Sequence, residues 1–308
     1  MSDEKIWYES IHELNIDESK VKNFYYPIKP GETIEFREGL AVKLVNLLRE
    51  LKIFIQFNLN REIYSKNLLS GQMDKEREEI MRNKLEEQIT KFKKTNQKMF
   101  ILLEIGSYMG ESLKMFGNVL EKNLDNYLVI SIDPFKKYAT ESDVKKGTAI
   151  STISKKIEKI YFYFLNNISK YKFRENFIHI RKNSTEGLEL LIKLKLNFDF
   201  IYLDGSHYYN DIKNDYLISK DLLKNYDGYR GLMSGDDYEL SANEYDRFYN
   251  SQEDFLNFLK ENTNFDYLHI KNKEGNLVGF HPGISLFFSE IKDKIIKTKS
   301  GYWYLDNN

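Results

Sequence analysis

Carboxylates and one imidazole gather after two apolar segments in the second half of the chain. Asp204-Gly-Ser-His207 follows one such run, and Asp236 and Asp237 follow another. If the two runs are neighbouring strands, three carboxylates project from one edge of a sheet and repel one another unless a cation lies among them. All-oxygen ligands without cysteine favour Mg²⁺, with Mn²⁺ or Ca²⁺ as substitutes. Asp204, Asp236 and Asp237 therefore predict a metal site; the competing interpretation is that Asp236 or Asp237 caps the next helix.

His207 stands three residues after Asp204. A neutral imidazole near pH 7 accepts a proton from a metal-polarised hydroxyl, a step that typically contributes on the order of 10²–10⁴-fold in rate. We therefore predict His207 and Asp204 as catalytic residues, with His207 as the general base. His281 and His179 are weaker candidates, and His179 lies inside a strand pattern, which favours a structural role.

A glycine turn follows an apolar run that ends at Leu103 and precedes a helical pattern. Strand, glycine turn and helix open a nucleotide-binding α/β unit. Gly106 would permit the tight turn, and Gly110 would let backbone or ligand approach closely. Asp133 ends the next apolar run, at a strand tip where a carboxylate can accept both hydroxyl hydrogens of a ribose diol.

Five apolar segments alternate with helical patterns, and polar or acidic residues follow each segment. In an open α/β sheet the ligand lies beyond the carboxyl ends of the strands. The expected strands are residues 100–103, 127–132, 177–180, 198–203 and 231–234, followed by a helix over 285–294 and an antiparallel closing pair, 295–296 with 302–305. The pattern predicts a Rossmann-like, doubly wound α/β sheet that is mostly parallel and has an antiparallel last strand. One helix is expected over residues 149–171.

The chain is predicted to consist of an N-terminal extension and a main domain that contains a long insertion. Residues 1–97 carry helical spacing over 40–55 and 80–92, which predicts a helical N-terminal extension or cap. The second of these segments is predicted to be a charged surface helix, with a disordered linker as the alternative. Residues 98–308 would form the main domain, in which 238–280 is a long insertion suited to an acceptor lid. The N-terminal helices would also suit a homo-oligomer interface.

The composition of the chain excludes several kinds of site and partner. The 308 residues include 41% hydrophobic and 30% charged residues, ordinary for a globular protein, and the net charge of −1 gives no basic field for nucleic acid. The absence of cysteine excludes disulfides, a thiolate nucleophile and a cysteine zinc site. The N-terminus lacks a signal-peptide apolar region, and no window reaches the roughly 18 apolar residues of a membrane span. We expect a cytoplasmic protein with no membrane partner.

Residues 98–305 resemble the class I S-adenosylmethionine-dependent methyltransferases, and most of all the metal-dependent O-methyltransferases of macrolide and aminocoumarin sugars. The resemblance is carried, in order, by Leu103-Glu-Ile-Gly-Ser-Tyr-Met-Gly110, Ile132-Asp-Pro134, Leu203-Asp-Gly-Ser-His207, Gly235-Asp-Asp-Tyr238, His281-Pro-Gly283 and Tyr302-Trp-Tyr304. It implies S-adenosylmethionine as the cofactor. It also implies a Mg²⁺ ion, held by the equivalents of the three aspartates, that takes two neighbouring acceptor hydroxyls.

The resemblance also implies a cofactor-binding role for nine residues. Asp133 would hold the ribose and Asp204 would border the site. Asn183 and Ser184 would lie near the adenine, although many relatives place an acidic residue there. The remaining members would border the methionine part or the pocket wall: Glu104, Gly106, Ser107, Tyr108 and Gly110. Met109 is a further wall candidate, with turn packing as its alternative.

The leading functional hypothesis is a Mg²⁺-assisted S-adenosylmethionine-dependent O-methyltransferase (EC 2.1.1.-) that methylates a hydroxyl of a sugar or another small hydroxylated acceptor. One alternative is a metal-independent methyltransferase with a different acceptor, such as a catechol or a nucleic-acid ribose; the near-zero net charge argues against nucleic acid. Another is a non-catalytic module that binds the cofactor, or that binds a partner through the N-terminal helices.

Overall fold

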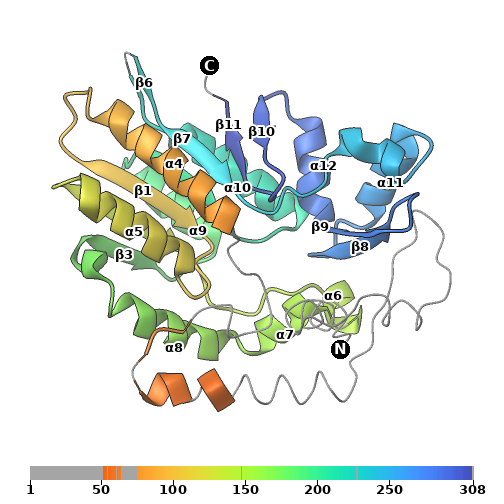
Figure 1. Cartoon of the computed structure of the whole chain (residues 1–308), viewed down its shortest axis with the longest axis horizontal. Coiled ribbons are helices and arrows are strands. Elements are labelled where there is room, and N and C mark those ends of the chain that lie inside the picture. Colours follow the sequence, from red (N-terminus) through yellow and green to blue (C-terminus); the bar gives the residue numbers. More distant parts are fainter. Residues whose placement is uncertain are drawn as a thin grey trace.

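A seven-stranded sheet with helices on both faces forms the centre of the molecule (Figure 1). The structure, a computed structural model, describes residues 51–53, 55–59, 61–63, 75–146, 148–226 and 228–306. The sheet strands are β1 (Phe100–Ile105), β2 (Tyr127–Ile132), β3 (Phe177–Ile180), β4 (Phe200–Leu203), β7 (Leu232–Gly235), β10 (Ile295–Lys297) and β11 (Trp303–Leu305).

The order of the strands confirms the predicted doubly wound sheet. It runs β10-β11-β7-β4-β1-β2-β3, with β1 to β4 and β7 parallel and β11 antiparallel to both β7 and β10. Strands β1, β2 and β3 follow one another toward one edge of the sheet. The chain then crosses back, so that β4 lies on the other side of β1 and the remaining strands follow toward the opposite edge. The switch point between β1 and β4 is where such sheets bind ligands.

Several predicted strands differ from the observed ones by one or two residues; β1, for example, continues to Ile105. β4 begins at Phe200, because Phe198 forms only an isolated bridge with Leu223 after α10. β7 is shifted by one residue and ends at Gly235. These shifts leave Asp204 and Asp236 directly after their strands, as expected.

Helices and small hairpins complete the described chain. The helices are α4 (Lys75–Phe92), α5 (Glu111–Asn123), α6 (Glu141–Lys146), α7 (Ala149–Lys155), α8 (Ile157–Ile168), η2 (Lys172–Asn176), α9 (Ser184–Lys193), α10 (Tyr209–Asp221), η3 (Ala242–Arg247), α11 (Gln252–Glu261) and α12 (Pro282–Glu290). The hairpins pair β5 (Asn225–Tyr226) with β6 (Tyr229–Arg230), and β8 (Leu268–Lys271) with β9 (Leu277–Phe280). The single helix expected over residues 149–171 is thus wrong: two helices, α7 and α8, occupy most of that range. No helix among the described residues is long and apolar enough to cross a membrane.

Alternation along the strands divides the core into two layers. Leu102 of β1 packs into a cluster with α4, α5 and α8, while Leu103 packs on the other side with α9, α10 and α12. Successive strand side chains point to opposite faces, so a strand buried on both faces must be apolar at nearly every position. This explains the continuous apolar runs that marked the strands in the sequence.

The charged segment before β1 is the helix α4, so the disordered-linker alternative is wrong. Its residues Leu85, Ile89 and Phe92 are buried, and the helix packs against α5. The other predicted N-terminal helix, over residues 40–55, falls mostly outside the described residues; 51–53 and 55 are helical. The division at residue 97 and the oligomer interface stay predictions.

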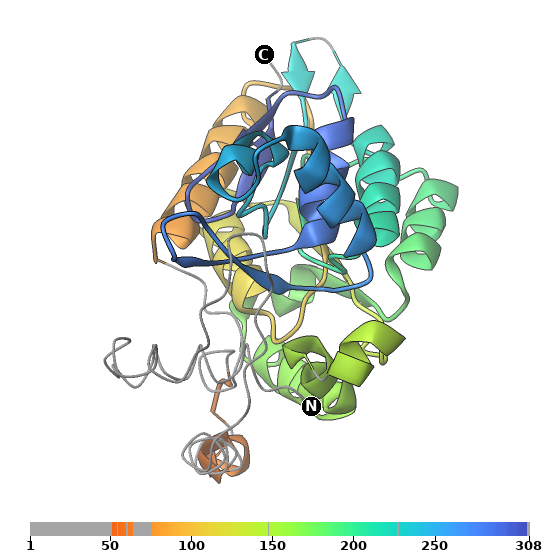
Figure 2. The ribbon, with the colours of Figure 1, turned by 90° about the vertical axis from the view of Figure 1, so that its right-hand side faces the viewer.

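The predicted insertion forms its own small layer beside the sheet. It contains η3, α11 and the β8–β9 hairpin, drawn in blue in Figure 2. A separate apolar cluster, with Phe255, Leu259, Ile270 and Phe280 at its centre, joins the insertion to Leu286 of α12. The insertion is therefore fixed to the sheet by packing on α12.

Candidate active site

The glycine turn after β1 depends on a close approach to the end of β4. Gly106 has φ of +85°, and an added Cβ there would lie 1.8 Å from the carbonyl oxygen of Asp204. Only glycine combines this left-handed backbone with the missing side chain. The turn therefore brings Asp204 directly against the motif that opens the cofactor unit.

Asp133 ties the tip of β2 to this turn. Its Oδ2 accepts hydrogen bonds from the backbone N–H groups of Ser107 at 3.0 Å and Tyr108 at 3.1 Å, and its Oδ1 accepts from Phe135 N at 2.8 Å. Burial raises the pKa of Asp133, and these backbone donors reduce that rise. Each carboxylate oxygen has two lone-pair directions, and the three backbone donors use three of the four, so Asp133 can hold the turn and still accept one hydrogen bond from a ribose hydroxyl at Oδ1.

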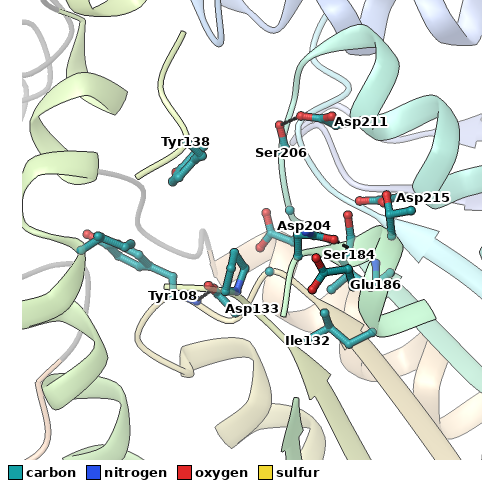
Figure 3. Close-up of a pocket in the computed structure, with 17 residues that line it drawn as sticks. Tyr108, Ile132, Asp133, Tyr138, Ser184, Glu186, Asp204, Ser206, Asp211 and Asp215 are labelled. Carbon is teal, nitrogen blue, oxygen red and sulfur yellow. Dashed lines mark hydrogen bonds between the residues drawn. The ribbon is translucent and has the colours of Figure 1, made fainter. Parts of the chain in front are cut away.

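A cavity of about 510 Å³ lies beyond the carboxyl ends of β1, β2 and β4. Its volume falls within the usual range of small-molecule sites. Figure 3 shows Asp133 and Asp204 at its centre, Tyr108 and Tyr138 on one side, and Glu186 on the other. The predicted cofactor residues that line it are Gly106, Tyr108, Asp133, Asn183, Ser184 and Asp204.

Glu104, Ser107 and Gly110 were also predicted as cofactor residues, but they are not among the described residues that line the cavity. Glu104 is fully buried beneath the turn, and its Oε1 accepts a 2.5 Å hydrogen bond from Ser112 Oγ. Burial raises its pKa to about 8. Gly110, at φ +78°, begins α5. These residues shape the turn.

Met109 is buried in the core. The expectation that it forms part of the pocket wall is therefore wrong, and turn packing is its role. A tight turn has two sides, and sequence spacing alone did not reveal that Tyr108 faces the cavity while Met109 faces the core.

The far end of the cavity contains an acid that the sequence did not reveal. Asn183 lines this end and also caps α9, accepting from Glu186 N at 2.8 Å. Asp215 of α10 lines it as well, is 3% exposed, and its Oδ1 has no hydrogen-bond partner among the described residues. Burial raises the pKa of Asp215 to about 7. The only sequence signal was an acid on the apolar face of a helix, between Ile212 and Tyr216.

These features fit an adenosyl cofactor. Asp133 offers a carboxylate to a diol, and the unpartnered oxygen of Asp215 offers an acceptor to an amino group such as that of adenine. Asp215 thus places a carboxyl group at the end of the cavity where Asn183 and Ser184 supply none.

The three predicted metal ligands converge at the ends of β4 and β7. One carboxylate oxygen from each of Asp204, Asp236 and Asp237 lies within 4.8 Å of the others. Leu203 pairs with Gly235 in the parallel ladder, and this register places the following acids side by side. The capping alternative is wrong, because Ser241 caps the next helix, η3. Three hard oxygen donors at this spacing fit a Mg²⁺-like ion.

An arginine that the sequence analysis did not identify also lies in this acid cluster. Arg77, in the first turn of α4, forms an ion pair with Asp236 Oδ2. Burial and the charge of Asp237 raise the pKa of Asp236 to about 6, although Arg77 opposes the rise. Burial also raises the pKa of Asp204 well above its usual value, with Asp237 and Asp236 adding to the effect. Arg77 stands in a densely charged stretch, so nothing in the sequence distinguishes it from its neighbours.

His207 lies between two carboxylates. Its Nε2 is 3.0 Å from Asp237 Oδ2, and its Nδ1 is 2.8 Å from Asp266 Oδ1. Burial by itself lowers the pKa of His207, but Asp266 and Asp237 raise it overall to well above the usual value. Both carboxylates therefore favour the protonated form of the imidazole. Asp266, from the insertion just before β8, was not predicted, because no pattern links it to His207 across 59 residues.

The other two histidine candidates differ in position. The ring of His281 lies 4.3 Å from that of His207, centroid to centroid, and its Nδ1 is 3.1 Å from Glu239 Oε2. Burial would raise the pKa of Asp237, but His281, His207 and Arg77 lower it overall. His179 lies on β3 with its Nδ1 2.8 Å from Ser131 Oγ and packs against aromatic rings, in line with the expected structural role.

Comparisons with known proteins agree with this architecture. Residues 103–238 match a family model described as a methyltransferase domain. A search of curated proteins found no match. Similar solved structures include CalS11, a TDP-rhamnose 3'-O-methyltransferase of calicheamicin biosynthesis (10% identity, 90% of this chain and 97% of that chain, TM-score 0.41). They also include the O-methyltransferase NovP (14% identity, 75% and 78%, TM-score 0.45) and a methyltransferase from Methanococcus maripaludis (15% identity, 77% and 94%, TM-score 0.32).

At these TM-scores the likeness to solved structures carries no argument about activity. The family match covers the glycine turn, the β2 tip and the acid cluster, all of which the sheet brings to its switch point. The match identifies residues 103–238 as a methyltransferase domain, and the sheet that contains it has the mostly parallel, Rossmann-like order of the class I S-adenosylmethionine-dependent methyltransferases.

Proposed function

We propose that this enzyme methylates a hydroxyl group of a sugar or another small hydroxylated acceptor, with assistance from a divalent cation such as Mg²⁺. One observation carries the proposal: Asp204 both lines the cofactor cavity and belongs to the acid cluster. An acceptor oxygen held at the cluster would thus face the cofactor. Good alignment of reacting groups can contribute roughly 7–11 kcal/mol to a displacement reaction.

On the cofactor side, the chain's own residues would bind and orient the donor. Asp133 would accept a hydrogen bond from a ribose hydroxyl at Oδ1 while its backbone donors hold it in place. Asp215 and Asn183 would face the adenine. The protonated Glu104 beneath the turn adds no negative charge below about pH 8.

On the acceptor side, Asp204, Asp236 and Asp237 would hold the ion. When bound, the ion would polarise the acceptor hydroxyl and offset the charge of Asp237, which otherwise favours a proton on His207. His207 would then accept the hydroxyl proton at Nε2. Asp266 Oδ1, 2.8 Å from Nδ1, would accept a hydrogen bond from Nδ1–H, which would fix the tautomer and leave Nε2 directed toward Asp237.

A second candidate is metal-independent methylation. The specific observation in its favour is the ion pair between Arg77 and Asp236, since a guanidinium already supplies a cation to the acid cluster. In that case Arg77 would compensate the carboxylates, and His207 with Asp204 would manage the acceptor proton.

Calorimetry and turnover assays test the two candidates. S-adenosylhomocysteine should bind with Mg²⁺ or with EDTA, because the cofactor cavity contains only one acid of the cluster. Turnover on a panel of sugars and other polyhydroxylated acceptors should disappear with EDTA and return with Mg²⁺. Full turnover in EDTA would favour the metal-independent candidate, and no turnover on any hydroxylated acceptor would count against O-methylation.

A further inference from the structure

Arg77 and a divalent ion would need the same carboxylate. The Arg77 guanidinium contacts Oδ2 of Asp236, and both side chains are largely buried, with 15% and 5% of their surface exposed. Asp236 is also one of three acids whose oxygens lie within 4.8 Å of one another. Its other oxygen, Oδ1, accepts from the backbone N–H of Asp237 at 2.9 Å. The oxygen that contacts Arg77 is therefore the one that is not already bonded to the local backbone.

The position of Arg77 on α4 suits a side chain with two arrangements. The helix is anchored further along by buried residues such as Met81 and Leu85, whereas Arg77 lies in its first turn. A long side chain at a helix end can leave its carboxylate partner without displacing the rest of the helix.

Electrostatics makes the two cations mutually unfavourable. A guanidinium and a divalent ion that share one carboxylate would lie within a few ångströms of each other, inside a region where burial weakens screening. Conversely, three buried carboxylates without either cation would repel one another. If one cation binds at a time, the carboxylates are compensated and the two cations do not repel each other.

We propose that Arg77 is a built-in competitor for the metal ion: it neutralises Asp236 when the site is metal-free and releases it when a divalent cation binds. The inference rests on the metal-assisted function proposed above. The metal affinity of the enzyme would then depend on α4, which lies outside the matched methyltransferase domain.

Metal binding by the full chain, without cofactor or acceptor, tests the proposal. Mn²⁺ is the probe, and electron paramagnetic resonance measures its free concentration. Arg77→Met should bind Mn²⁺ at least tenfold more tightly than the parent protein, while Arg77→Lys, which keeps the charge, should stay close to the parent. Arg82→Met is the matched control, because Arg82 lies on the same helix but pairs with Glu78 at the surface.

Thermal unfolding gives a second readout. Without metal, Arg77→Met should melt at a lower temperature than the parent, and saturating Mg²⁺ should raise its melting temperature more than that of the parent. If Arg77→Met does not fold, Arg77→Gln removes the same charge with a smaller loss of polar contacts. Binding of S-adenosylhomocysteine should be unchanged in every variant.

The outcomes separate this inference from the function on which it rests. Equal or weaker Mn²⁺ affinity in Arg77→Met, alongside clear binding by the parent, would overturn the competitor role and leave the metal site standing. No Mn²⁺ binding by any variant would overturn both. Tighter binding in Arg82→Met as well would mean a general charge effect, and would also overturn the role of Arg77.

Discussion

The cofactor cavity and the acid cluster both place carboxylates at strand ends, but they stabilise buried negative charge differently. On the cofactor side, Asp133 is held by three backbone N–H groups and Glu104 keeps a proton up to about pH 8. In the acid cluster, Arg77 and His207 lie within ion-pair distance of Asp236 and Asp237. One side uses backbone dipoles and protonation, and the other uses cationic side chains.

The difference follows from how the groups are brought together. Two backbone donors come from the glycine turn after β1 and the third from Phe135 beside Asp133, so they form together with the first strand–turn–helix–strand unit. In the acid cluster, Arg77 comes from the distant helix α4, and His207 after β4 reaches Asp237 only when β4 and β7 are paired. We infer that the cofactor side is fixed by the motif itself, whereas the acid cluster responds to distant elements and to bound ions.

The largest effect is expected at Asp204, which both regions share. Asp204→Asn should lower kcat by about 10²–10⁴-fold, the range that a positioned acid–base or ligand group contributes, while S-adenosylhomocysteine still binds. Steady-state kinetics and calorimetry measure the two quantities. Asp221→Asn, on the exposed end of α10, is the control. Turnover near that of the parent would show that the two regions do not meet at Asp204.

The next effect concerns the buried acid of the cofactor side. Burial raises the pKa of Glu104 from its ordinary 4.5 to about 8, so between these values the folded protein holds a proton that the unfolded chain has released. Stability should therefore fall as pH rises through this window. Glu104→Gln should remove the part of that slope that Glu104 contributes and stabilise the protein at pH 8 by up to about 4 kcal/mol.

Urea unfolding at several pH values measures this slope. Glu121→Gln, exposed on α5, is the matched control and should leave it unchanged. A residual slope is expected from the other buried acids, such as Asp215, but a slope as steep as that of the parent would contradict the raised pKa of Glu104.

A smaller effect is expected at Asp133. Asp133→Ala leaves three backbone donors without their acceptor and removes the proposed ribose contact, so affinity for S-adenosylhomocysteine should fall by about 10–100-fold. The affinity for Mn²⁺ should stay within a few fold of that of the parent, because the acids of the cluster have their own cationic partners, Arg77 and His207. Asp125→Ala, at an exposed position before β2, serves as control. Equal losses of cofactor and metal affinity would contradict the separation of the two regions.

The smallest effect is expected at Asp266. Asp266→Asn keeps the size of the side chain but weakens its hold on His207 Nδ1, so kcat should drop by about tenfold with little change in KM. Asp266→Glu should recover part of the loss. Asp254→Asn, in α11 of the same insertion, is the control. A change confined to KM would assign Asp266 to acceptor binding rather than to positioning His207.

Much of the fold was predictable because its signals are local. Strands buried on both faces require continuous apolar runs, and Gly106 marks a turn that no other residue can form. The convergence of Asp204 with Asp236 and Asp237 followed from a parallel sheet, since neighbouring strands must end at the same edge. The single helix expected over residues 149–171 failed because periodicity does not show where a helix breaks.

The sequence by itself determined the sheet, the turn and the acids at its edge, because residue type and spacing fix backbone conformation over short distances. Only the tertiary structure decided which cations meet those acids. Arg77, Asp266 and Asp215 reach the site through helix packing and a long insertion; Arg77 pairs with Asp236 and Asp266 with His207, both partners far away in the chain. Long-range electrostatic pairing leaves no periodic pattern in a sequence, and it exists only once the elements have packed.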